Sequence, residues 1–193
     1  MTKNFDQFCS KFLFESVNDD EYLILASEPE KNDEELQRMV NEAARATGTV
    51  WDVGDGKMYH GTRGNFNVMR VPAFFSPNPE IIYDQQQENN QHDYGDKIMQ
   101  FFLFGKVKFG VEMPEYTWGV RSVEDDRIAA AENEGYDIVE LVPYGDTSGG
   151  ENSFFVAINP SAIKSADPVT YDDSGNIIPL SQRFDSSKED IRY

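Results

Sequence analysis

The chain has 193 residues, and its 35 acidic and 17 basic residues give a formal net charge of -18. This charge argues against unaided binding to nucleic acid or to an anionic membrane surface, because both interactions need Lys and Arg. The single cysteine, Cys9, excludes an intrachain disulfide and a cysteine-based zinc site.

The length suits one domain, and a hydrophobic fraction of 39% is enough for a core without metal or disulfide support. No apolar run reaches the roughly 20 residues of a membrane span. No secretory segment follows Met1, so we expect a cytoplasmic protein. The acidity fits either simple solubility or attraction to a basic partner.

Helical periodicity dominates the N-terminal part of the chain. Phe5, Phe8 and Phe12 lie on one stripe, which predicts a helix in an N-terminal extension over residues 1–19.

A second, better-defined helix is predicted over residues 33–47. Asn32 caps it with Glu35 three residues later, and Gly48 ends it. Its apolar face consists of Leu36, Met39, Val40, Ala43 and Ala44.

Strand patterns follow in the middle of the chain. Strands are predicted at residues 57–61 and 71–76, and Asn78 and Pro79 introduce a helix over 80–87. The polar run 84–96 is interpreted either as a long loop or lid or as a solvated, low-complexity connection. Residues 97–111 predict at least one buried strand, with a hairpin around Gly105.

In the C-terminal half, predicted helices and strands follow one another in a less regular order. A helix begins at Ser122 and ends at Gly135, and two strands at 136–142 and 154–158 flank a Gly-rich connection. Residues 166–193 are polar and rich in turns, which predicts a wrapped or partly disordered tail on a domain spanning 20–193. Helices and strands are interspersed without strict alternation, so we predict an α+β fold.

Several common chemistries are excluded. The chain lacks a phosphate-binding G-x-x-x-x-G-K-[ST] loop, a dinucleotide-binding G-x-G-x-x-G and a G-x-S-x-G elbow. The two histidines, His60 and His92, lie too far apart for H-E-x-x-H spacing, so we expect no metal site built on histidine. A site built only from carboxylates stays open, although no EF-hand spacing occurs.

The stretch "GKMYHGTRGNF" places His60 beside a glycine near the end of a predicted strand. Such a histidine either is satisfied within a turn or points into a cleft where the glycine lets a ligand approach the backbone. His60, several aromatic residues and scattered carboxylates suit a reaction that needs no strong nucleophile. Displacement of nicotinamide from NAD is one, because a carboxylate stabilises its oxocarbenium-like transition state.

Six segments, in order, resemble the ADP-ribosyltransferase domains of phage and plasmid polyvalent proteins, relatives of the histidine-tyrosine-glutamate transferases. "EELQRMVNEAARATG" resembles the leading helix of that family, "MYHGT" its first catalytic strand, and "FFSPNPEIIY" its second strand and following helix. "GYDIVE" is similar to the family's "GYDG" strand, "FFVAINPSAIKSA" to "YVVFNPNQIKSA", and "RFDSSKEDIRY" to "FDPSNPDIRY". The resemblance runs from about Asp20 to Tyr193. It implies a split β-sheet or β-sandwich core with flanking helices and a cleft for NAD.

The resemblance also implies roles for individual residues. His60 would hydrogen-bond the nicotinamide-side ribose or the diphosphate. Gly61 would offer its backbone to the nicotinamide amide, and Thr62 would support the adenosine half. Phe75 and Ser76 would line the nicotinamide pocket.

Two roles have more than one candidate. The stacking tyrosine is Tyr83, which lies about two residues early on the expected helix, or Tyr94. The family's catalytic glutamate corresponds to Phe154 here, so Glu151 is the first substitute, with Glu140 and Asp146 as alternatives.

The function that the resemblance implies is mono-ADP-ribosylation of a host protein, with NAD as the substrate. The setting would be phage counter-defence or host takeover in the host cytosol, including an anti-CRISPR role. One alternative is an acidic, non-catalytic binding protein that occupies a basic nucleic-acid-binding groove of a host protein. Another is an NAD glycohydrolase, with water as the acceptor.

Overall fold

The computed structural model describes residues 18–51, 53–88, 97–114, 121–145, 150 and 152–193. Its helices are α2 (Asp19–Ser27), α3 (Asp33–Thr47), α4 (Pro79–Glu88) and α5 (Arg121–Asn133), with 3-10 turns η1 (Pro160–Ala162) and η2 (Leu180–Gln182). Its strands are β1 (Met58–Thr62), β2 (Ala73–Phe75), β3 (Lys97–Leu103), β4 (Val107–Glu112), β5 (Ile138–Val142), β6 (Phe154–Ala157) and β7 (Ile163–Ser165). The described chain is therefore a mixed α+β protein, as predicted.

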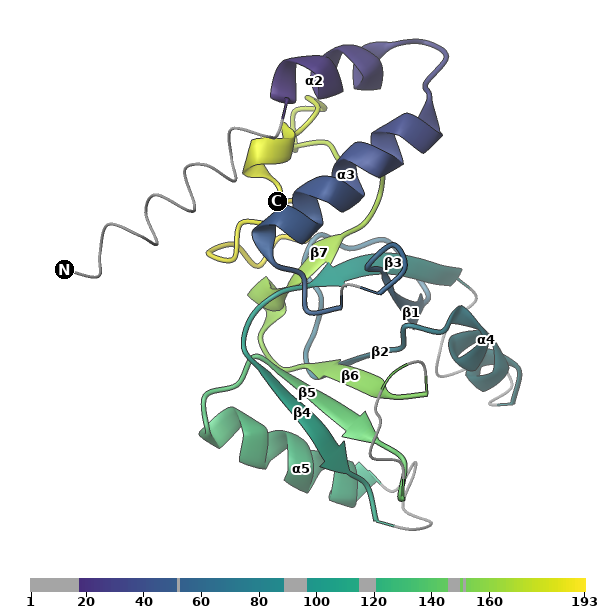
Figure 1. The fold of residues 1–193 in the computed structure, drawn as a ribbon, viewed down its shortest axis with the longest axis vertical. Helices are drawn as coiled ribbons and strands as arrows, with labels where there is room; N and C mark the ends of the chain where they lie inside the picture. Colours follow the sequence, from purple (N-terminus) through teal and green to yellow (C-terminus); the bar gives the residue numbers. More distant parts are fainter. Residues whose placement is uncertain (1–17, 52, 89–96, 115–120, 146–149, 151) are drawn as a thin grey trace, which may run out of the picture.

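The strands form two sheets (Figure 1). One has the order β1-β3-β7 and is antiparallel throughout. The other has the order β2-β6-β5-β4, in which only β4 and β5 run parallel. Within the described residues, one bridge between Tyr59 of β1 and Ser76, directly after β2, links the two sheets. The first half of β1 therefore lies where the sheets meet.

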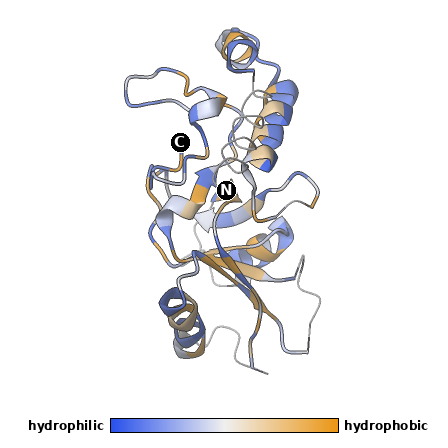
Figure 2. Ribbon diagram, turned by 60° about the vertical axis from the view of Figure 1, so that its left-hand side comes forward, coloured by the Kyte–Doolittle hydropathy of each residue, from blue (hydrophilic) through white to orange (hydrophobic). Residues whose placement is uncertain are grey.

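Apolar residues pack in three clusters, and hydrophobic residues are concentrated in the strands (Figure 2). The cluster that both sheets share includes Met58, Phe75, Phe101, Phe155 and Ile163. A second cluster packs α5 against β5 and β6, and a third packs α2 and α3 against the end of β3 and the C-terminal tail. The shared cluster lies directly beneath the strand that carries His60.

The helix predicted over residues 33–47 is confirmed as α3. Asn32 Oδ1 accepts the Glu35 N–H at 3.2 Å, and Gly48 ends the helix in the left-handed conformation with φ of 97°. The five predicted apolar residues are all buried. The capping residues and the 3.6-residue period of apolar side chains were therefore sufficient to predict this helix from the sequence.

The hairpin predicted around Gly105 is wrong, because β3 and β4 belong to different sheets. After Gly105 the chain turns toward β5: Lys106 donates its N–H to Asp137 Oδ2 at 2.9 Å and accepts the Asp137 N–H at 2.9 Å. A Cβ on Gly105 would lie 2.7 Å from the Asp137 carboxylate. The glycine therefore allows a crossing between sheets rather than a tight turn.

The polar run 84–96 is not entirely a loop, because α4 continues to Glu88. Gln86 is buried, and its Nε2 donates to the Lys97 carbonyl at 3.4 Å, which ties the helix to the start of β3. The remainder of the predicted lid lies outside the described residues. The predicted N-terminal helix with Phe5, Phe8 and Phe12 does too.

Residues 166–193 are packed onto the domain by two buried cations. Arg183 donates to the Ser165 and Asp167 carbonyls at 3.0 and 2.8 Å. Lys164 on β7 donates to the Lys188 carbonyl at 2.6 Å, and burial lowers the pKa of Lys164 to about 8. Both cationic side chains donate their hydrogen bonds to main-chain carbonyls rather than to carboxylates.

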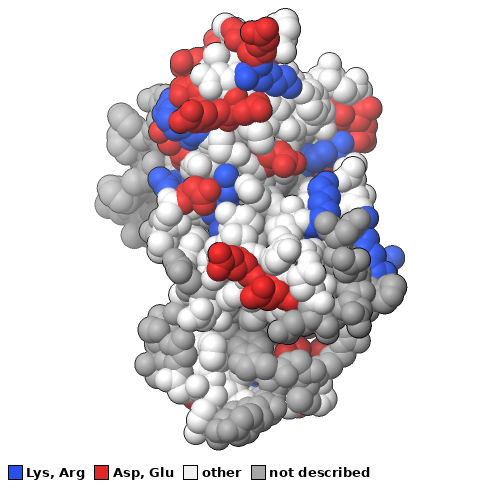
Figure 3. Space-filling model, turned by 90° about the vertical axis from the view of Figure 1, so that its right-hand side faces the viewer, with Lys and Arg blue, Asp and Glu red and all other residues white. Residues whose placement is uncertain are grey.

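Acidic side chains are prominent over α2 and α3, at the top of the face drawn in Figure 3. Both helices begin with three acidic residues, which suit the positive end of the helix dipole. None of the described helices combines the length and the apolarity that crossing a membrane requires.

Candidate functional site

His60 is held in one orientation on β1. Its Nδ1 lies 2.8 Å from the Phe74 carbonyl oxygen, and its ring lies near the rings of Phe75 and Phe101, with centroids 5.3 and 6.4 Å away. A carbonyl only accepts, so Nδ1 carries the hydrogen and donates it. In the neutral ring this leaves Nε2 as an acceptor.

Burial lowers the pKa of His60, and the hydrogen bond to Phe74 opposes that shift without cancelling it. The imidazole is therefore neutral at neutral pH. A neutral ring whose Nδ1 is already engaged accepts a hydrogen bond from a hydroxyl group. It does not donate one to a phosphate. Of the two partners predicted for His60, the ribose suits this protonation state and the diphosphate does not.

Gly61 leaves one side of its backbone open. Tyr59 exchanges both hydrogen bonds with Ser76, at 2.8 and 3.0 Å, so the Tyr59 N–H and C=O point away from β3. Alternate residues of a strand point the same way, so Gly61 directs its N–H and C=O to that side too, beyond the bridge. Within the described chain no residue pairs with them. One donor and one acceptor side by side match a primary carboxamide.

Phe75 and Ser76 support this region from the core. Both are fully buried, and the Phe75 ring packs edge-on against Phe101 at 5.5 Å. Ser76 Oγ accepts the Asn78 N–H at 3.1 Å, which fixes the turn into α4. Neither side chain is exposed in the structure, and their role in lining a nicotinamide pocket stays a prediction.

Of the remaining predicted binding residues, Thr62 is partly exposed and Tyr83 is exposed. Thr62 Oγ1 lies 3.5 Å from the Gly64 N–H, in a local turn after β1. Tyr83 is 55% exposed on α4, which packs against β1. Tyr94 lies outside the described residues, so Tyr83 is the one candidate for stacking whose place is known.

Among the candidate carboxylates, Glu140 lies in the described chain, whereas Glu151 and Asp146 lie outside it. Glu140 is 5% exposed on β5, and its carboxylate accepts the Gly110 N–H at 2.9 Å and the Gly150 N–H at 3.4 Å. It therefore ties edge strand β4 to the connection that leads into β6.

Glu140 also shares a sheet face with the residues beneath His60. Phe155 is the register partner of both Glu140 and Phe75, and register partners point to the same face. Two strand spacings separate Glu140 from Phe75, about 10 Å. Nearby, Ser153 is fully buried, and its Oγ finds no hydrogen-bond partner in the structure.

Sequence reasoning missed a pocket of about 580 Å³ on the other side of β3. Its walls come from five separate parts of the described chain, represented by Gln37, Asn67, Gln100, Thr170 and Arg192. Among the described residues, none of those predicted to bind NAD lines it. No local motif marks such a pocket, because segments far apart in the sequence build it.

The described residues contain no group of three or more His, Cys, Asp or Glu side chains that could hold a metal ion. No family model, curated protein or solved structure matches the chain. The site must therefore be judged on its own chemistry.

Proposed function

We propose that the chain is a mono-ADP-ribosyltransferase that moves ADP-ribose from NAD to a side chain of a host protein. The observation that carries this proposal is the open backbone of Gly61 beside a neutral His60. The carboxamide of nicotinamide would donate to the Gly61 carbonyl and accept from the Gly61 N–H. The ordered resemblance to phage transferase domains supports the same assignment, and with it a role in counter-defence in the host cytosol.

His60 would orient the substrate. Its Nε2 accepts a hydrogen bond from a ribose hydroxyl, which uses the neutral form that burial favours. Tyr83 or Tyr94 would stack on the nicotinamide. Thr62 would lie toward the adenosine half.

A carboxylate would stabilise the transition state. The bond between ribose C1′ and the nicotinamide nitrogen breaks, its electron pair goes to the ring nitrogen, and positive charge develops at C1′. The acceptor side chain then bonds to C1′ and loses its proton. We assign the carboxylate to Glu151, because the Glu140 carboxylate is already engaged by two backbone N–H groups.

The test uses the full chain, NAD and a bacterial lysate, with intact mass spectrometry of the lysate proteins. Transfer predicts an NAD-dependent adduct with the mass of one ADP-ribosyl group, lost in Glu151→Gln. The control Glu132→Gln makes the same charge change at an exposed position of α5 and keeps the adduct.

Other outcomes would replace the proposal. Released nicotinamide without any adduct would identify an NAD glycohydrolase. With neither product, NAD-independent binding to a basic protein that weakens steeply with salt would identify the acidic binding protein. An adduct that persists in Glu151→Gln would keep the transferase and move the carboxylate to Glu140 or Asp146.

A further inference from the structure

The pocket missed by sequence reasoning lies along the edge of β3 that faces away from β1. Residues Lys97–Gln100 form one wall. The opposite walls come from residues 65–67, residues 165–171 and the segment 191–192. Strand β7 covers the same edge of β3 only from Phe101 to Leu103.

The ladder between β3 and β7 stops at Gln100. The last bond is from the Ala166 N–H to the Gln100 carbonyl, at 3.1 Å. Ile98 is two residues away on the same strand, so its N–H and C=O point to the same side as those of Gln100, into the pocket. No residue of the described chain takes up either group.

The tail cannot complete this ladder, because it is pinned elsewhere. Pro168 has no N–H to donate. Arg183 binds the Ser165 and Asp167 carbonyls, and Gln37 Nε2 donates to the Ala166 carbonyl at 3.1 Å. These contacts occupy the carbonyls of residues 165–167, and beyond Ala166 no residue of the described tail pairs with β3.

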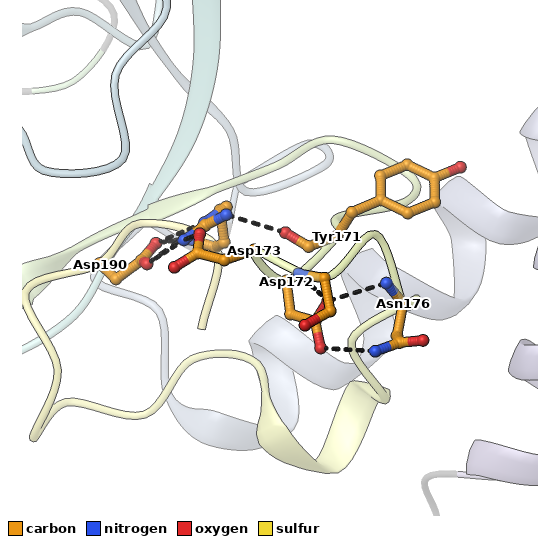
Figure 4. Close-up of polar contacts among 7 residues, drawn as sticks. Tyr171, Asp172, Asp173, Asn176 and Asp190 are labelled. Atoms are coloured by element: carbon orange, nitrogen blue, oxygen red, sulfur yellow. Dashed lines mark hydrogen bonds and ion pairs between the residues drawn. The ribbon is translucent and has the colours of Figure 1, made fainter.

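Both cationic side chains that line the pocket have polar partners, and the third charged lining residue, Asp167, is exposed. Arg192 forms ion pairs with Asp173 and Asp190 at 2.8 and 2.7 Å and donates to the Tyr171 carbonyl (Figure 4). Lys97 Nζ donates to Asn65 Oδ1 at 2.8 Å. A highly charged ligand therefore gains little here, whereas an unpaired strand edge selects for another backbone.

We infer that this pocket binds an extended segment of a partner polypeptide, which adds a short strand to β3 where β7 ends. Lys97 and Met99 direct their N–H and C=O toward β1, and the Gln100 carbonyl already accepts from Ala166, so the added strand pairs with β3 through Ile98. The Ile98 N–H and C=O supply this pair of hydrogen bonds, and the side chains of Asn67 and Gln100 belong to residues that line the same pocket. Main-chain pairing supplies the affinity, and the pocket walls select uncharged side chains. The inference does not depend on NAD.

The probe is a pool of blocked hexapeptides with valine or threonine at alternate positions and uncharged residues elsewhere. A twin pool carries N-methyl groups at alternate residues, which keeps the side chains but removes the N–H groups of one edge. Amide exchange and NMR shifts of the full chain are followed without NAD. We expect the first pool to slow exchange at Ile98 by on the order of tenfold and the twin pool to have no effect.

Two variants sharpen the result. Ile98→Pro removes the N–H that faces the pocket and leaves the ladder to β1 complete, so it abolishes binding. Ile98→Val keeps the N–H and binds as the parent chain does. The twin pool tests the parent chain directly, so the result stands even if the proline variant fails to fold.

Three outcomes would overturn the inference. The Ile98 amide could already be protected in the free chain, which would mean that the chain covers its own edge. The N-methylated pool could bind as well as the first pool, which would mean that side chains alone are recognised. Finally, neither pool could alter exchange at about 1 mM, the weak end of measurable affinity.

Discussion

Gly61 on β1 and Ile98 on β3 are register partners, and each leaves one N–H and one C=O unpaired within the described chain. The two open edges face opposite ways across the ladder. Beside Gly61 lie the bridge from Tyr59 to Ser76 and the half-buried His60 ring. Beside Ile98 lies a pocket of about 580 Å³.

This difference shows how surroundings assign different ligands to the same backbone groups. At Gly61 the bridge closes the edge one residue pair away, which leaves room for a single donor and acceptor. At Ile98 the open N–H and C=O face a pocket of about 580 Å³ that four consecutive residues of β3 line, which gives room for a segment of backbone. The edge at Gly61 therefore fits a carboxamide group, and the edge at Ile98 fits an extended polypeptide segment.

The largest expected effect is that of His60→Ala, which should impair the Gly61 edge and leave the Ile98 edge unaffected. His60→Ala removes the ribose acceptor, and we expect NAD turnover to fall on the order of 100-fold. Protection of Ile98 by the hexapeptide pool stays unchanged, because the pool binds on the far side of β3. Nicotinamide release measures NAD turnover, and amide exchange measures the protection of Ile98. NAD turnover within twofold of the parent would remove His60 from the reaction.

A matched pair of proline variants breaks one edge at a time. Gly61→Pro removes the N–H that faces away from β3, and we expect KM for NAD to rise about tenfold, the value of one hydrogen bond. Gly61→Ala is the control, because it keeps the N–H. Initial rates over a range of NAD concentrations supply KM. Equal KM values for the alanine and proline variants would show that this N–H does not contact the substrate.

Glu140 offers a smaller test, through the connection that carries Glu151. Glu140→Ala leaves the Gly110 and Gly150 N–H groups without their acceptor, and we expect a loss of about 1–3 kcal/mol in unfolding free energy. Glu140→Gln keeps an acceptor oxygen, so its free energy of unfolding should fall by less. Urea unfolding measures the stability, and faster amide exchange at Gly150 reports the release of the connection. Unchanged exchange at Gly150 would mean that Glu140 does not position it.

The smallest effect is the pH dependence of His60. Its folded-state pKa is lowered, so below the ordinary value of about 6.5 the unfolded chain binds the proton more readily than the folded chain. The stability contribution is complete above that pH and is lost as the pH falls below it. Compared with His60→Gln, the parent chain should lose more stability on acidification. Urea unfolding at neutral and mildly acidic pH measures this difference. An equal loss of unfolding free energy in the parent chain and in His60→Gln would contradict the prediction.

Local sequence was enough for some elements and misleading for others. α3 was predictable because Asn32, Gly48 and the apolar period act within one helix. The hairpin at Gly105 failed because the Asp137 side chain, distant in sequence, directs the chain into the other sheet. The buried roles of Lys164 and Arg183 were missed because their carbonyl acceptors carry no sequence signal.

The sequence by itself determined the α+β class, the capped helix α3 and the strand that places His60 beside Gly61. Only the tertiary structure decided which backbone groups stay open, because the direction of each N–H depends on register with strands distant in the chain. It also decided that Phe75 and Ser76 lie in the core rather than on a surface. Pairing between remote strands, not local propensity, creates both open edges.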